Sequence, residues 1–297
     1  MPNNIVLAEK FLPILDGIYA KESLTNRLLG ANARIRFDGG NAVEIFKTSL
    51  DGFGDYNRST GFPVGSVTSG WDKYTLSKDR GISLSVDAMD DEETLGMAFG
   101  TLAEEFIRTQ EVPELDAYRF AAMASATGVD GASADITVGT TDCPGLIDAA
   151  EESMGDNEVP REGRILYVSE KFYHGIKSKI TRYLANENGV NREIEVFNGM
   201  EVVRVPKTRF NTAITLNDGT SNFGWAVASG SYAINFMIVS PTAVLPVVKH
   251  EVPRIWTPAE NINADAYKFD LRVYHDCFIL KNKSKGIYVH RAATANA

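Results

Sequence analysis

The feature that most constrains the fold of this chain is a long helical pattern between residues 90 and 128. Consecutive acidic residues from Asp90 to Glu93 stand where a helix dipole favours negative charge, at an N-terminus. Apolar residues then recur at spacings of four, three and four, as on one face of a helix: Leu95, Phe99, Leu102 and Phe106. About 35 residues at ~1.5 Å each span roughly 50 Å, which is long for a globular core. The pattern therefore predicts a helical strut.

A proline divides this predicted strut. Pro113 removes a backbone donor and crowds the preceding turn, so we expect a kink or a break there. The apolar pattern resumes with Leu115, Tyr118 and Ala122. It stops at Gly128, a residue typical of the position after a helix C-terminus.

A second constraint is the glycine-rich segment 51–70, which cannot build a core of its own. Aromatic residues are nevertheless interleaved with its glycines or follow it directly: Phe53, Tyr56, Phe62 and Trp71. Upstream, alternating residues flank Gly39 and Gly40 and predict a hairpin, and alternation resumes downstream at 82–86. We expect two strands with a long excursion between them, whose aromatic side chains are buried against a partner.

The rest of the chain alternates short helices and strands, so the predicted class is α+β. Pro144 begins a short helix, and a buried strand at 164–168 precedes a helix that continues to Ile180. Asn198-Gly199 separates two alternating runs and predicts a hairpin. Further strands are expected at 233–239, 244–248 and 267–280. After a turn, residues 287–289 should pair back onto the last of these strands.

Composition excludes several classes of protein. Asp and Glu exceed Lys and Arg by 39 to 30, a net charge of −9, which argues against a protein whose main task is binding nucleic acid. The two cysteines lie far apart in the sequence, so we expect no disulfide framework and a reducing, intracellular setting. Charged residues interrupt the opening segment, and no run approaches the ~20 apolar residues of a membrane span. We expect a soluble protein with no membrane association.

The sequence contains one candidate nucleophile, a cysteine. Cys143 lies between Asp142 and Pro144, at a predicted helix N-terminus that could lower the pKa of its thiol. Paired with His174, it could act in a Cys-dependent hydrolase. No third catalytic group or local family signature surrounds it, so we favour a small residue that caps the helix.

Candidate metal ligands are equally sparse. His275 and Cys277 lie two apart on a predicted strand and face the same side, but zinc requires further ligands. Asp87 and the acidic residues 90–93 lack the spacing of a calcium loop, and a solvated helix start explains them better. No phosphate-binding loop is present in the sequence. We expect no catalytic site, no cofactor and no metal.

The order of the predicted parts resembles that of the major capsid proteins of tailed bacteriophages, which have the Hong Kong 97-like fold that encapsulin shells share. The runs that carry the resemblance cover most of the chain, and their order and spacing matter more than any single run. They include residues 56–58, 61–62, 74–76, 79–81, 86–90, 93–94, 112–119, 164–169, 199–202 and 272–276.

The resemblance implies a division into named parts. Residues 1–32 would be an N-terminal arm and residues 33–88 an extended loop that overlaps a neighbouring subunit. Residues 89–180 and 255–297 would form the peripheral domain with the strut, and residues 181–254 the axial domain. The residues of the extended loop implied in subunit contact are Tyr56, Arg58, Phe62, Trp71 and Arg80.

The function implied is structural. Pentamers and hexamers of the chain would close an icosahedral shell, the capsid of the virion, assembled in the host cytoplasm. Such a shell encloses DNA without sequence-specific binding, so the acidic charge is compatible with it. Because the sequence begins almost at the arm, a separate scaffold protein is expected, along with a portal. Lys73 and Lys78 are available for crosslinking to a neighbour, but we expect none.

Two alternatives to a phage capsid remain open. An encapsulin-like nanocompartment shares the fold, and only its cargo would separate it from a phage shell. A hydrolase that uses Cys143 and His174 is the alternative from another class of protein.

Overall fold

The computed structural model describes residues 23–29, 35–38, 41–89, 97–187 and 190–296. The acidic run 90–93, Leu95, the Gly39-Gly40 turn and most of the predicted N-terminal arm lie outside these residues. Of that arm, the structure describes residues 23–29, which include the short turn η1 (Asn26–Leu28).

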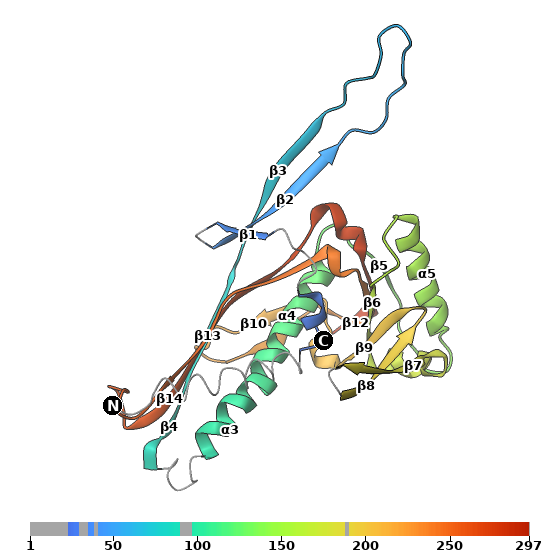
Figure 1. The fold of residues 1–297 in the computed structure, drawn as a ribbon. Coiled ribbons are helices and arrows are strands. Elements are labelled where there is room, and N and C mark those ends of the chain that lie inside the picture. The colour runs from blue at the N-terminus through green and yellow to red at the C-terminus, as the bar shows by residue number, and fades with distance from the viewer. Residues whose placement is uncertain (1–22, 30–34, 39–40, 90–96, 188–189, 297) are drawn as a thin grey trace.

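The predicted strut is present as one long rod, visible in Figure 1 as α3 and α4. It consists of α3 (Met97–Phe106), a π-helical turn η2 (Ile107–Glu111) and α4 (Val112–Ser125). The Val112 N–H donates to the Ile107 carbonyl across the wider turn. Pro113 then occupies the first turn of α4, where a missing donor is tolerated, so the helical backbone continues instead of breaking.

The strut ends slightly earlier than the sequence predicts. Ser125 is its last residue, and Ala126 is already extended. Gly128 follows with a φ of +85°, a left-handed conformation that favours glycine, but it belongs to the turn after the helix.

A three-stranded antiparallel sheet runs alongside the first half of the strut. Its strand order is β13-β14-β4, with the bounds β4 (Lys78–Asp87), β13 (Val244–Trp256) and β14 (Ala266–Ile279). Apolar residues of the strut, among them Ile107 and Leu115, pack against Phe269 and Leu271 of β14. The alternation at 82–86 therefore belongs to a strand of this sheet, although residues 78–87 were predicted as part of the extended loop.

A seven-stranded sheet forms the centre of the molecule. Its order is β5-β15-β12-β6-β9-β8-β7. The bounds are β5 (Asp130–Ser133), β6 (Ile165–Ser169), β7 (Thr181–Glu187), β8 (Val190–Phe197), β9 (Met200–Val205), β12 (Tyr232–Val239) and β15 (Ile287–Ala295). The strands of this one sheet come from both the predicted peripheral and the predicted axial ranges, so the boundary at residue 180 runs through it.

Helices cover both faces of the central sheet. The end of α4 packs on one face through Phe120 and Met123, near Tyr167 and Met237. Helices α5 (Cys143–Asp156) and α6 (Glu170–Ile176) cover the other face, near Leu166. Because β6 is covered on both sides, its sequence is a continuous apolar run and not an alternating one.

The end of the chain departs from its prediction. Residues 287–289 do not pair back onto β14; they lie in β15, which pairs with β12 and β5. The physical reason is that β13 and β4 already occupy both edges of β14. The predicted turn at 281–286 is present as the 3₁₀ turn η6 (Lys281–Gly286), and it carries the chain from one sheet to the other.

The Asn198-Gly199 hairpin is confirmed. Val196 pairs with Glu201 and Phe197 with Met200, while the two turn residues have φ values of 48° and 82°. Positive φ at both turn positions suits the right-handed twist of the strands. A second, shorter hairpin, β10 (Ile214–Leu216) with β11 (Trp225–Val227), was not predicted. The remaining short turns are η3 (Lys177–Lys179), η4 (Lys207–Arg209) and η5 (Pro241–Ala243).

An arm projects from the body at one end of the β13-β14-β4 sheet (Figure 1). It is built from β1 (Ile35–Asp38), β2 (Ala42–Leu50) and β3 (Val67–Thr75), in the order β1-β2-β3. The pairing of Phe37 with Val43 confirms the first predicted hairpin. Within the part of the chain that the structure describes, no helix is long and apolar enough to span a membrane.

Candidate subunit interface

The root of the arm is anchored in the body. Val43 and Leu76 are buried in a small apolar cluster with Leu245 and Val247 of β13. The ring of Tyr74 lies 5.2 Å from that of Phe278, centroid to centroid. This packing gives the arm a fixed base, from which the outer ribbon extends beyond the body.

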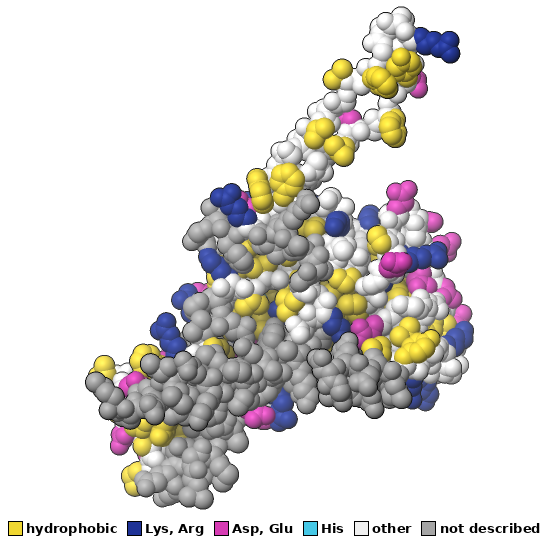
Figure 2. Space-filling view, viewed as in Figure 1, with side chains coloured by type: hydrophobic (Ala, Val, Ile, Leu, Met, Phe, Trp, Pro, Cys, Tyr) yellow, Lys and Arg dark blue, Asp and Glu magenta, His cyan; other side chains and the backbone are white. Residues whose placement is uncertain are grey.

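Beyond the root, β2 and β3 continue as a two-stranded ribbon whose aromatic residues contact each other. Phe46 pairs directly with Trp71, and their rings meet edge to face at 5.3 Å. Phe46 is 36% exposed and Trp71 is 49% exposed. Figure 2 shows hydrophobic side chains along the whole length of the arm. The pair therefore leaves apolar surface in contact with solvent.

The tip of the arm, residues 51–66, is held by hydrogen bonds of its own. The Gly61 N–H donates to the Asn57 carbonyl at 2.7 Å, and the Asn57 N–H donates back to the Gly61 carbonyl at 3.2 Å. Gly61 has a φ of +83°, which a residue with a side chain adopts reluctantly. At the base of the tip, the Ser66 N–H donates to an Asp51 carboxylate oxygen at 2.7 Å. These bonds shape the tip without burying its side chains.

The aromatic residues of the tip also form a pair. The rings of Tyr56 and Phe62 meet edge to face at 5.0 Å, and Phe62 is still 85% exposed. Arg58 is exposed in the turn between them. Four of the predicted contact residues are thus accessible on the projecting arm: Tyr56, Arg58 and Phe62 at its tip, and Trp71 in the ribbon below the tip.

Arg80, the remaining predicted contact residue, lies elsewhere. It belongs to β4, and its guanidinium forms a two-pronged ion pair with Glu114 of the strut at 2.6 and 3.1 Å. It also donates to the carbonyls of Asn217 at 2.5 Å and Gly224 at 3.1 Å. Arg80 therefore connects the strut to the β10–β11 hairpin within its own chain, a role that the sequence did not reveal.

Other residues of the arm were missed as contact candidates. Leu50 and Val67 pair across the ribbon and are 69% and 68% exposed. Val64 is also exposed, and so is Phe53, one of the aromatic residues that the sequence predicts to be buried against a partner. The alternation of Phe46, Thr48 and Leu50 within β2 is the sequence signal that could have identified Leu50, because residues two apart in a strand share a face.

The thiol of the candidate Cys–His pair is not activated as a nucleophile. The Cys143 side chain is buried against Gly175, where any added side chain would collide with its Sγ. Burial and the neighbouring Asp142 raise the pKa of the thiol, contrary to the effect expected from a helix N-terminus. His174 is exposed on α6. The Asp142 carboxylate accepts from the Gly145 N–H and caps the helix.

His275 and Cys277 are packing residues in β14. Both are buried, and burial lowers the pKa of His275 to about 4 and raises the pKa of Cys277 to about 12, so both stay neutral near pH 7. The imidazole meets the ring of Tyr118 edge to face at 5.3 Å. Among the described residues, no group of three or more His, Cys, Asp or Glu side chains could hold a metal ion.

Solved structures with this arrangement are found among viral shells. The chain is similar to a structure titled "Capsid structure of the Cyanophage P-SCSP1u", with 14% identity, a TM-score of 0.56 and coverage of 89% of this chain and 87% of the other. The asymmetric unit of the bacteriophage PhiM1 mature capsid matches with 14% identity, a TM-score of 0.55 and coverages of 91% and 87%.

A third match comes from outside the phages. The crystal structure of a virus-like particle from Pyrococcus furiosus matches with 12% identity, a TM-score of 0.51 and coverages of 93% and 95%. Comparison of the sequence with protein-family models and with curated proteins finds no match.

These likenesses define the fold. The chain has the Hong Kong 97-like capsid fold along about nine-tenths of its length, as its sequence predicted. At such low identity the likeness concerns the fold alone.

Proposed function

We propose that this protein is the major capsid protein of a tailed phage, a structural subunit without turnover. The observation that carries the proposal is an arm that projects from a capsid-like body and exposes aromatic side chains, Phe53 and Phe62 above all. Exposed apolar patches of this extent mark surfaces that bind another macromolecule. The partner of the arm would be the neighbouring copy in a shell.

The energetics favour such a contact. Burying one large apolar side chain contributes roughly 1.5–3 kcal/mol. The tip is already held by the Asn57–Gly61 hydrogen bonds, so little additional order has to be imposed on its backbone when it binds. A contact of modest strength suffices, because each subunit of a closed shell makes many contacts simultaneously.

The geometry favours rings over dimers. An arm that points away from its own body contacts a different surface on its neighbour, and repetition of such a heterologous contact closes a ring when the rotation fits. We propose that these rings are pentamers and hexamers and that they join into an icosahedral shell. The enclosed DNA would be held by confinement, without sequence-specific binding, which agrees with the net charge of −9.

The finer organisation is also proposed. The strut and the β13-β14-β4 sheet would form the peripheral domain, and the central sheet with α5 and α6 would belong to the axial domain, extending it beyond residues 181–254. Residues 1–32 would be the N-terminal arm. The extended loop, predicted at 33–88, would be the projecting arm of β1, β2 and β3, and would therefore end at Thr75. A separate scaffold protein, a portal and assembly in the host cytoplasm complete the proposal.

An encapsulin-like compartment is the second candidate. It is supported by the likeness to the virus-like particle from Pyrococcus furiosus, which covers 95% of that chain. The two candidates predict the same shell but different contents: a phage head packages DNA, whereas a compartment of this kind encloses a protein cargo.

Electron microscopy of the purified protein tests the proposal. The protein would be expressed alone and together with phage scaffold and portal proteins, and imaged after sedimentation. Closed shells or rings are expected in at least one of the two preparations. Monomers in both would contradict a capsid role. Nuclease-protected DNA in particles recovered from an infected host would favour the phage head over the compartment.

A further inference from the structure

The outer arm has two chemically different faces. In an antiparallel ribbon, directly paired residues lie on the same side and successive residues lie on opposite sides. One side therefore carries three cross-strand pairs, which define the apolar face: Phe46 with Trp71, Thr48 with Ser69, and Leu50 with Val67. Its central pair is small, and its outer pairs are large and apolar.

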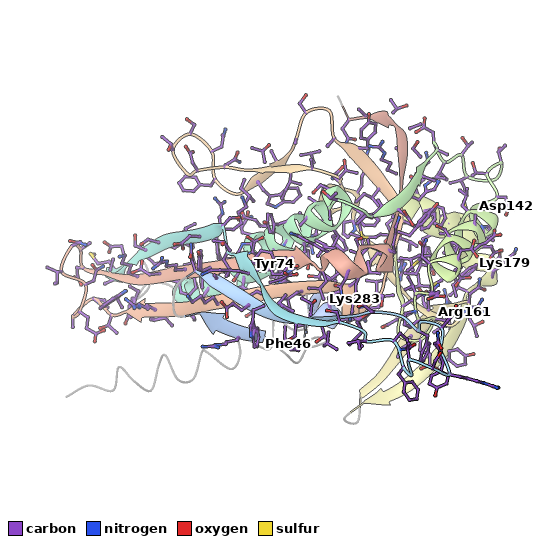
Figure 3. All side chains as sticks on the ribbon, turned by 90° about the horizontal axis from the view of Figure 1, so that it is seen from above. Phe46, Tyr74, Asp142, Arg161, Lys179 and Lys283 are labelled. Atoms are coloured by element: carbon purple, nitrogen blue, oxygen red, sulfur yellow. The ribbon has the colours of Figure 1, made fainter. Side chains whose placement is uncertain are left out.

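The opposite side, the polar face, is defined in β3 by Thr68, Gly70 and Asp72. Towards the root, the same side continues into Tyr74, which packs on Phe278 of the body. Figure 3 shows Phe46 and Tyr74 on opposite sides of the ribbon. The body therefore covers the polar side of the arm at its root, and the described residues of the body leave the apolar face exposed along its length.

The amount of exposed apolar surface is that of a protein interface. The aromatic side chains of the arm each bury about 150–250 Å² when fully covered. Summed over the apolar face and the tip, which carries Phe53, Tyr56 and Phe62, their exposed parts leave roughly 600–700 Å² uncovered. Leu50 and Val67 add to this area. A standard interface buries ~800 Å² on each partner, so the arm presents about one partner's share.

We propose that the apolar face, and not the polar face, lies against a second copy of this chain. The inference rests on the proposed function and deepens it, because it states which side of the arm the neighbour covers. The arm points away from its own body, so the same copy does not cover this face.

Two adjacent residues offer a matched test. Ser69 and Thr68 are both exposed hydroxyl residues in β3, but Ser69 belongs to the apolar face and Thr68 to the polar face. The two native cysteines, Cys143 and Cys277, are buried. A cysteine introduced by Ser69→Cys or by Thr68→Cys would therefore be the accessible thiol of its variant.

The rate of maleimide labelling would be measured for both variants, as free subunits and as assembled particles. Both free subunits should react at similar rates. In particles, the Ser69→Cys thiol should react at least about tenfold more slowly, while the rate of Thr68→Cys should stay within about twofold of its free value. Equal protection of the two thiols, equal reactivity or protection of Thr68→Cys alone would overturn the inference.

A charge placed on each face provides a second measurement. Ser69→Arg should lower the particle yield at least about tenfold, because an arginine would be buried without a partner, and Thr68→Arg should assemble within about twofold of the unmodified chain. Equal yields for the two variants would contradict the inference while leaving the capsid role intact. If the unmodified chain forms no particles under any condition, the proposed function fails, and this inference fails with it.

Discussion

Two aromatic pairs in this molecule have similar distances between their rings and opposite surroundings. In the core, the rings of Phe172 and Phe236 lie 4.8 Å apart and both side chains are fully buried. On the arm, the rings of Phe46 and Trp71 lie 5.3 Å apart and remain 36% and 49% exposed. The local contact is much the same, so the difference lies in what surrounds it. The core pair is covered by its own chain, and the arm pair requires a neighbour.

The comparison predicts a large loss of stability when the covered pair is truncated. Phe236→Ala should lower the free energy of unfolding by about 3–5 kcal/mol, because it removes buried contacts and leaves a cavity in the central sheet. Chemical denaturation of the isolated subunit measures this value. A loss under about 1 kcal/mol would show that the core pair is no better covered than the arm pair.

The buried imidazole of His275 should make the stability of the subunit depend on pH. The folded-state pKa of His275 is about 4, below its ordinary value near 6.5. Between these values the unfolded chain binds more protons, so stability is complete above pH 6.5 and falls as the pH drops towards 4, by up to about 3 kcal/mol. Thermal unfolding from pH 7 to 4, compared with His275→Gln, measures the effect. Parallel curves for the two proteins would mean that His275 does not contribute.

Truncation of the core thiol of Cys143 should have the smallest effect on stability. Cys143→Ala removes one buried sulfur, so we expect a loss of about 1 kcal/mol or less and unchanged assembly. Cys277→Ala, in the other buried position, is the matched control. A thiol-dependent hydrolytic activity that is present in the unmodified protein and absent in Cys143→Ala would contradict the structural role proposed for this chain.

Local patterns predicted local structure well. The spacing of Leu102 and Phe106 indicated the strut, and Asn198-Gly199 indicated a hairpin whose turn geometry the structure confirms. In both cases the signal lies within a few residues. The π-helical turn before Pro113 was not predicted, because the sequence shows the cause of the disturbance but not how the backbone accommodates it.

Features that depend on distant neighbours could not be predicted. The partners of β15 depend on which edges of β14 are occupied, and the role of Arg80 depends on Glu114 and the β10–β11 hairpin being close to it. For the arm, the glycine-rich composition predicted a long excursion that carries aromatic residues such as Phe62. It did not define the apolar face, because that requires the register in which Leu50 pairs with Val67.

The central claim is that the aromatic residues of the arm serve assembly and not folding. The double variant Phe62→Ser and Trp71→Ser tests it directly, with Thr60→Ala and Thr68→Ala as a control pair on the same exposed arm. The free energy of unfolding of the isolated subunit should change by less than about 1 kcal/mol, as for other surface substitutions. The particle yield of the double variant should fall sharply, while the control variant assembles normally. A large drop in the melting temperature of the subunit, or an unchanged particle yield, would contradict the account.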